Sequence, residues 1–283
     1  MSAIEFRPLA GVAIAHIAET FNAAFADYVV KLQLTPEQLQ YKMQQEDIAL
    51  DCSVGAFVNR QLAGFILHGL RNEDGRQLYY NAGTGVIPTH RGHGLTAGMY
   101  AWWRQHTAAP APAQLSLEVI TTNTKAEHIY SSIGFRRQRT FNIWKGKAPA
   151  ACCKKPLQFQ QVAVLPWAEV QSWWRVMPAW SATPASIAAL KDQAWILTAQ
   201  LGHQLVGYCC IGAHNERILQ LAVAPAHRKK GIASALLAET SRRWQKDEWM
   251  VLNADAGDEQ LNRFFANMHW QLVLQQYEMT LSL

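Results

Sequence analysis

Apolar positions follow the same order twice along the chain. Short runs typical of strands come first, and segments with apolar residues at helical spacing follow them. In the first half, the predicted strands are residues 4–9, 53–59, 62–69, 78–86 and 115–121. In the second half, they are residues 157–165, 195–200, 205–212, 218–223 and 249–253. Each half is expected to end with a further helix and a strand pair.

Helical segments separate these strands. Residues 11–46 and 166–191 precede the hairpins, and Thr35-Pro36 supplies an N-cap and first-turn signal in the former. Residues 95–103 and 232–244 follow the fourth strand of each half. Hairpins joined by helical crossovers predict an α+β (layered α/β) fold class, with a mostly antiparallel twisted sheet and helices on both faces in each half.

One motif occurs in both halves. Residues 86–94 read VIPTHRGHG and residues 223–231 read VAPAHRKKG, so Val, Pro, His, Arg and Gly recur at a single offset. Both copies lie between a predicted strand and a predicted helix. Residues 146–156 are rich in Ala, Lys and Pro without periodicity. We therefore predict two tandem domains, 1–146 and 157–283, with a linker at 147–156.

Composition narrows the functional classes. Charged residues make up only 17% of the 283 positions, which argues against a disordered chain, and the net charge of +5 is spread over both halves. This balance suits an anionic small molecule better than nucleic acid. No apolar run is long enough for a membrane span, and the start lacks the basic region of a secretory signal. Five cysteines, without metal-ligand spacing, predict reduced thiols in a cytoplasmic protein and no metal site.

The repeated motif has the features of an anion site. Backbone N–H groups at a helix N-terminus lack intrahelical partners and favour negative charge. Gly92 and Gly94 allow a bulky phosphate to approach, and Arg91 can add a charge-assisted contact. The loop by itself is also compatible with an ordinary helix N-terminus. It lacks the spacing of a nucleotide P-loop or a dinucleotide fingerprint.

The loop resembles the acetyl-CoA motif Q/R-x-x-G-x-G/A of the GCN5-related N-acetyltransferase (GNAT) superfamily. RGHGLT at 91–96 matches except at Thr96, and RKKGIA at 228–233 matches fully. The resemblance implies that the loop wraps the CoA pyrophosphate and that the strand before it binds the pantetheine arm. The implied acetyl-CoA contacts in the first half are Val86, Ile87, Arg91, Gly92, His93, Gly94, Leu95, Thr96, Asn123, Ala126 and Tyr130.

Residues 117–135 carry a second and more specific resemblance, to L-E-V-x-x-x-N-x-x-A-x-x-x-Y-x-x-x-G-F. It implies that Tyr130 is the general acid for the leaving thiolate and that Glu118 is the candidate base. Their spacing matches that of ribosomal-protein alanine N-acetyltransferases. The alternatives are a Tyr that packs on the sheet and a solvent-facing Glu. Asn123 is expected to cap the helix or to bind the cofactor arm.

The second half keeps the pattern but changes its chemistry. Asn253 stands in the place of Glu118, and Phe265 in the place of Tyr130. Asn is no base at neutral pH and Phe has no proton to give, so we expect a degenerate copy. A possible second cofactor site comprises Val223, Arg228, Lys229, Lys230, Gly231, Ile232 and Ala233. Trp173 and Trp174 either pack in this half or line a pocket at the domain junction.

The sequence therefore predicts a tandem GNAT N-acetyltransferase that transfers an acetyl group from acetyl-CoA to a primary amine by direct attack. The acceptor is a small molecule or a peptide, without a nucleic-acid or membrane partner. The expected form is a monomer whose halves make a pseudo-dimer. Two alternatives stay open: an acetyl-CoA sensor or scaffold without transfer, and catalysis in the C-terminal half.

Overall fold

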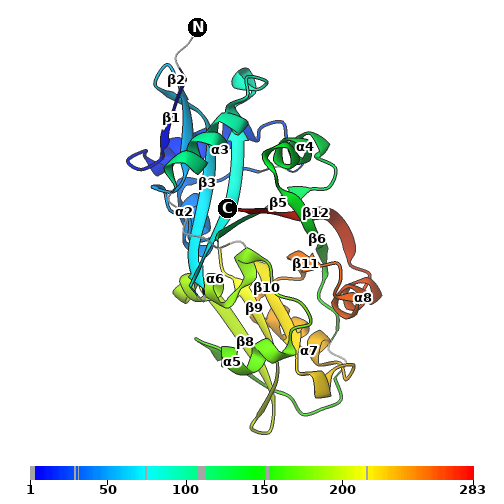
Figure 1. Cartoon of the computed structure of the whole chain (residues 1–283). Coiled ribbons are helices and arrows are strands. Elements are labelled where there is room, and N and C mark those ends of the chain that lie inside the picture. Colours follow the sequence, from blue (N-terminus) through cyan, green and yellow to red (C-terminus); the bar gives the residue numbers. More distant parts are fainter. Residues whose placement is uncertain are drawn as a thin grey trace. The chain divides into compact units, whose positions relative to one another are not determined.

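The computed structural model describes residues 4–28, 30, 32–73, 75–107, 113–150, 153–214 and 216–283. The chain divides into two compact units, shown in Figure 1. The first unit is Met1–Gln138 together with Tyr277–Leu283, and the second is Arg139–Gln276.

The first unit contains a sheet with the strand order β1-β2-β3-β4-β5-β12. The pairs β1–β2, β2–β3 and β3–β4 are antiparallel, and the pair β4–β5 is parallel. The strands are β1 (Ile4–Pro8), β2 (Val54–Val58), β3 (Gln61–Glu73), β4 (Arg76–Val86), β5 (Ala113–Ile120) and β12 (Gln271–Ser282). The predicted mostly antiparallel arrangement is confirmed.

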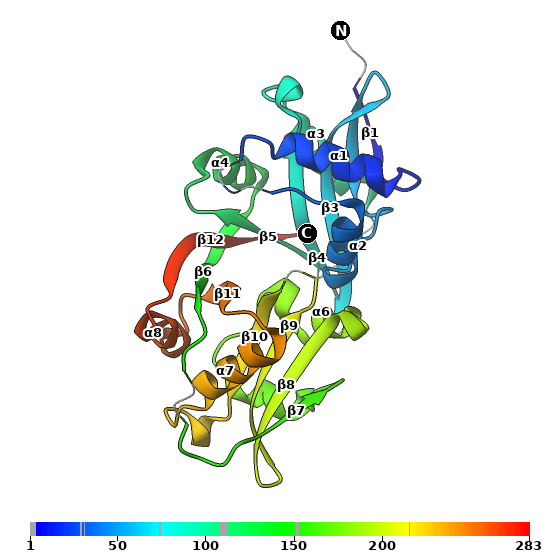
Figure 2. The same cartoon turned by 180° about the vertical axis from the view of Figure 1, so that it is seen from behind.

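Helices cover both faces of this sheet. Helices α1 (Ile14–Ala24) and α2 (Pro36–Gln45) bury Ile17, Phe21 and Leu39 against one face. Helices α3 (Leu95–His106) and α4 (Thr124–Ile133) pack on the other, as Figures 1 and 2 show from opposite sides. Thr35 caps α2 through a capping box, as the sequence predicts, because its hydroxyl accepts a hydrogen bond from the Gln38 backbone N–H.

The second unit repeats the arrangement, with the strand order β6-β11-β10-β9-β8-β7. Its strands are β6 (Arg136–Lys147), β7 (Gln158–Val162), β8 (Ala194–Leu201), β9 (Gln204–Gly212), β10 (Arg217–Val223) and β11 (Glu248–Asp255). One face packs against α7 (Ile232–Trp244) and α8 (Glu259–Asn267). The other packs against α5 (Trp167–Val170) and α6 (Pro184–Ala189).

Two expectations need correction. The strand pair predicted at the end of each half is one long strand, β6 in the first half and β12 in the second. Neither stretch contains a turn signal in its centre, so nothing breaks the strand. The helical material expected at 166–191 is two short helices joined by 3₁₀ turns and irregular chain, because Pro166, Pro178 and Pro184 interrupt it.

The boundaries of the compact units differ from those of the predicted halves at the last strand of each half, β6 and β12. From Arg139 onward β6 belongs to the second unit, and from Phe141 onward it pairs with β11. Met279 and Leu281 of β12 are buried in the core of the first unit, and the Leu283 N–H donates to the Ala113 carbonyl. The first unit is therefore completed by the last residues of the chain.

Cys52, Cys153, Cys209 and Cys210 are free thiols. Cys152, and residue 151 of the predicted linker, lie outside the described residues. None of the helices within the described ranges is both long and apolar enough to cross a membrane.

Candidate active site

Strands β4 and β5 separate partway along their length and open a gap in the first sheet. They are paired from Gln77↔Ala113 to Asn81↔Leu117, and the register ends there. Beyond this point β4 stays paired with β3 as far as Val86. The final residues of β4 therefore present one backbone edge that no strand of the described chain covers. Such an edge can bind an extended ligand through main-chain hydrogen bonds.

A glycine loop follows β4 and leads into α3. Gly92 and Gly94 have φ of +82° and +72°, and α3 begins immediately afterwards at Leu95. A Cβ at either glycine would meet no atom within 4 Å, so the loop surface is open. The first N–H groups of α3 are available to an anion, and positive φ explains the glycines.

Arg91 does not turn toward this open surface. Its guanidinium makes two hydrogen bonds to the Asp27 carboxylate, at 2.6 and 2.8 Å, and others to the Ala24 and Val86 carbonyls. The side chain thus fastens the loop to the chain that follows α1. The charge-assisted phosphate contact expected for Arg91 stays a prediction, and in this structure the side chain anchors the loop. Asp27 holds the Arg91 pKa above its usual range through the same hydrogen bonds.

Tyr130 lies on α4 and packs edge-to-face against Tyr100 and Phe135. Burial raises the pKa of its phenol, and hydrogen bonding with Thr84 and Asn81 works in the opposite direction. Both partners lie in β4 where β5 departs from it. The phenol is therefore half-buried at the mouth of the gap and holds its proton at neutral pH.

Glu118 lies on β5, and its carboxyl accepts a hydrogen bond from the Tyr80 hydroxyl of β4. Burial raises the Glu118 pKa to about 8, the nearby carboxylates of Glu278 and Glu46 add to this, and the Tyr80 hydrogen bond opposes it. The group can therefore exchange a proton near neutral pH, which is what a general base requires.

Tyr130 and Glu118 reach the gap from opposite faces of the sheet. Leu117 and Val119 belong to the core that contains Tyr130. Side chains alternate along a strand, so Glu118 between them projects to the other face. The phenol and the carboxyl thus flank the opening between β4 and β5.

Asn123 and Ala126 form the start of α4. The Asn123 side chain accepts a hydrogen bond of 3.1 Å from the Ala126 N–H, and its amide donates to the Tyr28 hydroxyl at 3.3 Å. The capping role expected of Asn123 is what the structure contains. Tyr28 joins α4 to the chain that Arg91 anchors.

The second unit builds the same loop with the same anchor. Gly231 has φ +80° and precedes α7. Arg228 donates to the Val223 carbonyl at 3.1 Å, as Arg91 does to Val86, and also to the Trp173 carbonyl. Lys230 instead turns back to the Ala226 carbonyl. The repeated Arg is thus a structural anchor in both units.

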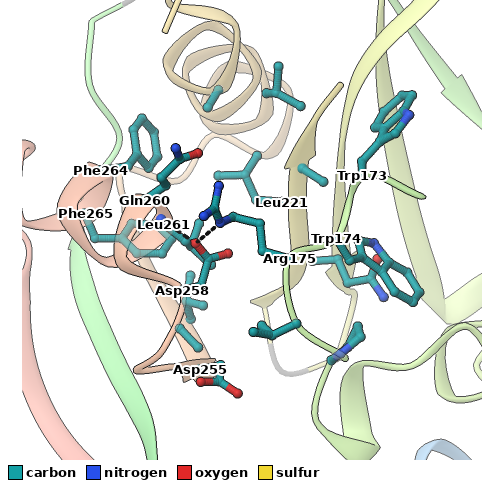
Figure 3. A pocket seen from close by; sticks show the side chains of 18 of the residues that line it. Trp173, Trp174, Arg175, Leu221, Asp255, Asp258, Gln260, Leu261, Phe264 and Phe265 are labelled. Carbon is teal, nitrogen blue, oxygen red and sulfur yellow. Dashed lines mark hydrogen bonds and ion pairs between the residues drawn. The ribbon is translucent and has the colours of Figure 1, made fainter. Parts of the chain in front are cut away.

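A cavity of about 510 Å³ lies within the second unit, between the loop, α8 and the segment after α5. Figure 3 shows it, with Arg175 and Asp258 facing one another at 3.8 Å. Val223, Arg228, Lys229, Gly231, Ile232 and Ala233 line it, whereas Lys230 does not. Strands β10 and β11 are paired only at Ile218↔Val251, so this unit has a gap between its parallel strands as well.

The substituted residues Asn253 and Phe265 both line the cavity. Asn253 has φ +55°, a region that non-glycine residues rarely adopt, and β11 is irregular there. Its Oδ1 is buried and has no hydrogen-bond partner among the described residues. Trp173 and Trp174 also line the cavity, so they are pocket residues of the second unit.

Residues 191–271 match the family model described as Acetyltransferase (GNAT) domain. The chain has the GNAT acetyltransferase fold. A GCN5-related N-acetyltransferase from Sphaerobacter thermophilus is 18% identical, with a TM-score of 0.70 over 99% of this chain and 95% of that one. A tandem GNAT protein from the clavulanic acid biosynthesis pathway is 15% identical, with a TM-score of 0.73 over 99% and 98%.

A fungal GCN5-related glucosamine N-acetyltransferase region, within a multi-domain β-N-acetylglucosaminidase, gives a TM-score of 0.74 at 12% identity. The match covers 99% of this chain and 38% of that chain. No curated protein matches the sequence. The GNAT family model matches within the second unit, whereas the motifs predicted the closer resemblance in residues 1–146.

The candidate site of the first unit also contains residues that the sequence motifs did not indicate. Asp27 and Tyr28 lie in the chain that follows α1, and Tyr80, Asn81 and Thr84 come from β4. None belongs to a recognisable motif. Strand alternation could have placed Tyr80 on the face of Glu118, but the pairing of β4 with β5 was needed to bring them together. Within the described ranges, no group of three or more His, Cys, Asp or Glu could hold a metal ion.

Proposed function

We propose that this GNAT protein is an N-acetyltransferase whose first unit transfers the acetyl group of acetyl-CoA to a primary amine. One observation carries the proposal: the Tyr130 phenol and the Glu118 carboxyl flank the gap between β4 and β5 from opposite faces. An amine acceptor must lose a proton and a departing thiolate must gain a hydrogen bond, so two proton-handling groups on opposite sides suit this reaction.

The loop fits a diphosphate. The open surface at Gly92 and Gly94 and the free amides of α3 provide anion contacts without side-chain charge. The exposed edge of β4 suits the pantetheine arm. Acetyl-CoA would supply an activated carbonyl and a good leaving group. The proposed contacts are Val86, Ile87, Gly92, His93, Gly94, Leu95, Thr96, Asn123 and Ala126, with Arg91 anchoring the loop from behind.

In the proposed reaction, Glu118 and Tyr130 each handle one of the two proton transfers. Glu118, with its pKa near 8, accepts a proton from the acceptor ammonium directly or through water. The neutral amine forms the new C–N bond as the C–S bond breaks. Tyr130, whose pKa is raised, remains a phenol and offers its proton to the leaving sulfur. Holding the two reactants together is expected to contribute more than either proton transfer.

Matched loop variants test this assignment. Gly94→Glu places a carboxylate in the proposed diphosphate site of the first unit, and Gly231→Glu does the same in the second. We expect Gly94→Glu to abolish thiol release from acetyl-CoA with a panel of amines. Gly94→Ala controls for the strain of a side chain at φ +72°. If only Gly231→Glu abolishes turnover, catalysis belongs to the second unit.

A second candidate function rests on the cavity of the second unit and on its GNAT family match. This unit is proposed to bind the coenzyme without transferring its acetyl group, because Phe265 and Asn253 replace the proton-handling groups. CoA would then raise the melting temperature. If both units bind CoA, Gly94→Glu should leave part of the CoA-induced rise in melting temperature. We expect the double variant Gly94→Glu/Gly231→Glu to lose that remaining rise.

A further inference from the structure

A bulge in β4 brings two polar side chains onto one face of the first sheet. The register of β4 with β3 shifts between Leu67 and His68, which makes Ala82 an additional residue of β4. Side chains alternate along a regular strand, and an additional residue shifts this alternation by one position. Asn81 and Thr84 therefore project to the same side, and a hydrogen bond of 2.8 Å joins them.

The Asn81 amide directs one N–H group to each of two hydroxyl groups. The Gly83 backbone N–H donates to its Oδ1 at 3.0 Å, which fixes the end of the amide that is the oxygen. The amide nitrogen donates to the Thr84 hydroxyl at 2.8 Å and to the Tyr100 hydroxyl of α3 at 2.6 Å. Each hydroxyl accepts one of these hydrogens and so keeps its own hydrogen for a further acceptor.

The Tyr130 phenol lies beside this group of side chains. Its ring packs edge-to-face against the ring of Tyr100, with the ring centroids 6.3 Å apart. Burial raises the pKa of both phenols, and hydrogen bonding with Thr84 and Asn81 lowers the pKa of both. The two phenols thus converge on the same pair of side chains of β4.

The second unit lacks these polar residues together with the phenol. Its strand β10 has the equivalent bulge, because the register with β9 shifts between Ile218 and Gln220. Apolar residues occupy the four equivalent positions: Ile218 for Asn81, Leu221 for Thr84, Leu237 for Tyr100 and Phe265 for Tyr130. These residues pack in one apolar core, and the unit still builds the same arrangement of strands and helices. The fold therefore does not require the polar residues, and their presence beside the phenol indicates a role in what the phenol does.

Proton transfer to sulfur leaves Tyr130 as a phenolate, which is the species that needs stabilisation. In this step the O–H bond of the phenol breaks, an S–H bond forms on the departing thiolate, and the electron pair stays on the phenol oxygen. Solvent later returns the proton. A phenol of reference pKa about 10 gives a proton to a thiolate of about 8.5 only at an energetic cost, and burial of Tyr130 increases this cost. Hydrogen bonds to the charged form reduce it.

We propose that the Asn81 amide orients the Tyr100 and Thr84 hydroxyls so that they donate to the phenol oxygen of α4 as it becomes negative during proton transfer to sulfur. The three are positioning residues, because they act through the phenol. Hydrogen bonds in series polarise one another, so the amide strengthens both donors. The inference rests on the proposed function, in which Tyr130 is the acid.

Fluorine NMR of the full chain, labelled with 3-fluorotyrosine, tests the inference without turnover. Tyr130→Phe assigns the signal of that residue among the eight tyrosines. Tyr100→Phe should raise the pKa of the Tyr130 phenol by about one unit, since the phenolate loses a donor. Tyr79→Phe is the matched control and should leave this pKa unchanged, because Tyr79 is similarly buried but donates to Gln77 at 2.8 Å. An unchanged or lowered pKa in Tyr100→Phe overturns the inference.

Kinetics of acetyl transfer supply a second measurement. Tyr100→Phe should lower kcat about tenfold and leave the KM for acetyl-CoA near the wild-type value, because the lost hydrogen bond forms fully only with the phenolate. In the Tyr130→Phe background, Tyr100→Phe should not lower kcat further, since there is no phenolate to stabilise. An equal loss in both backgrounds would show that Tyr100 acts on the structure and not through the phenol.

Thr84→Val keeps the inference testable if Tyr100→Phe fails to fold, which the melting temperature shows. Val has the shape of Thr without the hydroxyl, and the variant should also raise the Tyr130 pKa and lower kcat. The failures of the two proposals differ. Absence of thiol release from the wild type contradicts the transferase activity, whereas the fluorine titration still decides whether the hydroxyls donate to Tyr130. An unchanged Tyr130 pKa in both variants, with transfer intact in the wild type, overturns the inference alone.

Discussion

The Tyr80 hydroxyl donates a hydrogen bond to the Glu118 carboxyl between the parallel strands β4 and β5. Burial raises the pKa of both groups, and the hydrogen bond is the main influence that lowers the Glu118 pKa. We therefore expect Tyr80 to act as a positioning residue that adjusts the pKa of the proposed base.

The pH profile of acetyl transfer should follow this pair. Glu118 must be deprotonated to act, so kcat/KM should rise about tenfold per pH unit below a pKa near 8 and level off above it. Tyr80→Phe removes the stabilising hydrogen bond, raises the Glu118 pKa and moves the midpoint to higher pH. The acceptor amine also titrates, but its contribution is the same in both proteins. An unshifted midpoint in Tyr80→Phe would show that Glu118 is not the base.

Tyr130→Phe should lower kcat for acetyl transfer about 10²-fold or more, because the leaving sulfur loses its hydrogen-bond donor. The ring keeps its contacts with Tyr100 and Phe135, so the KM for acetyl-CoA should stay close to the wild-type value. Tyr277→Phe, which changes a phenol stacked on Arg137, is the matched control. Wild-type kcat for Tyr130→Phe across the pH range would refute the acid assignment.

Arg91→Gln should raise the KM for acetyl-CoA about tenfold and change kcat little, because the loop loses its anchors at Ala24, Asp27 and Val86. Asp27→Asn should have a smaller effect, since the carbonyl anchors remain. Steady-state kinetics of both variants checks this order. A loss of kcat without a change in KM would show that Arg91 acts in acetyl transfer itself and not by anchoring the loop.

His68 should make the protein sensitive to acid. Burial lowers its pKa to about 3, its Nδ1 lies 3.1 Å from the Cys52 carbonyl, and its ring stacks on Trp103. Between pH 6.5 and about 3, the unfolded chain binds a proton that the folded chain does not, so stability falls as pH falls. His68→Leu should reduce this slope by up to about 1.4 kcal/mol per pH unit. Chemical denaturation at pH 7, 6, 5 and 4 measures it, and equal slopes in both proteins would contradict a neutral buried His68.

Local patterns in the sequence were sufficient for the repeated architecture. Strand and helix periods, the Thr35 cap and the glycines at 92, 94 and 231 each depend on neighbours in the chain, and the structure contains them as predicted. The gap between β4 and β5 and the contacts of Arg91 could not be predicted from neighbouring residues in the sequence. The guanidinium is held by Asp27, a residue 64 positions away, whose contribution no spacing rule indicates.

The sequence by itself determined the tandem layout, the two glycine loops and the loss of the phenol and carboxyl in the second copy, because these follow from residue identity and short-range periodicity. Only the tertiary structure decided that Tyr80 adjusts Glu118, that residues 277–283 complete the first unit, and that Asn253 is buried without a donor. These properties arise from strand pairing and burial over long sequence separations, where the environment of a group, and not its type, sets its chemistry.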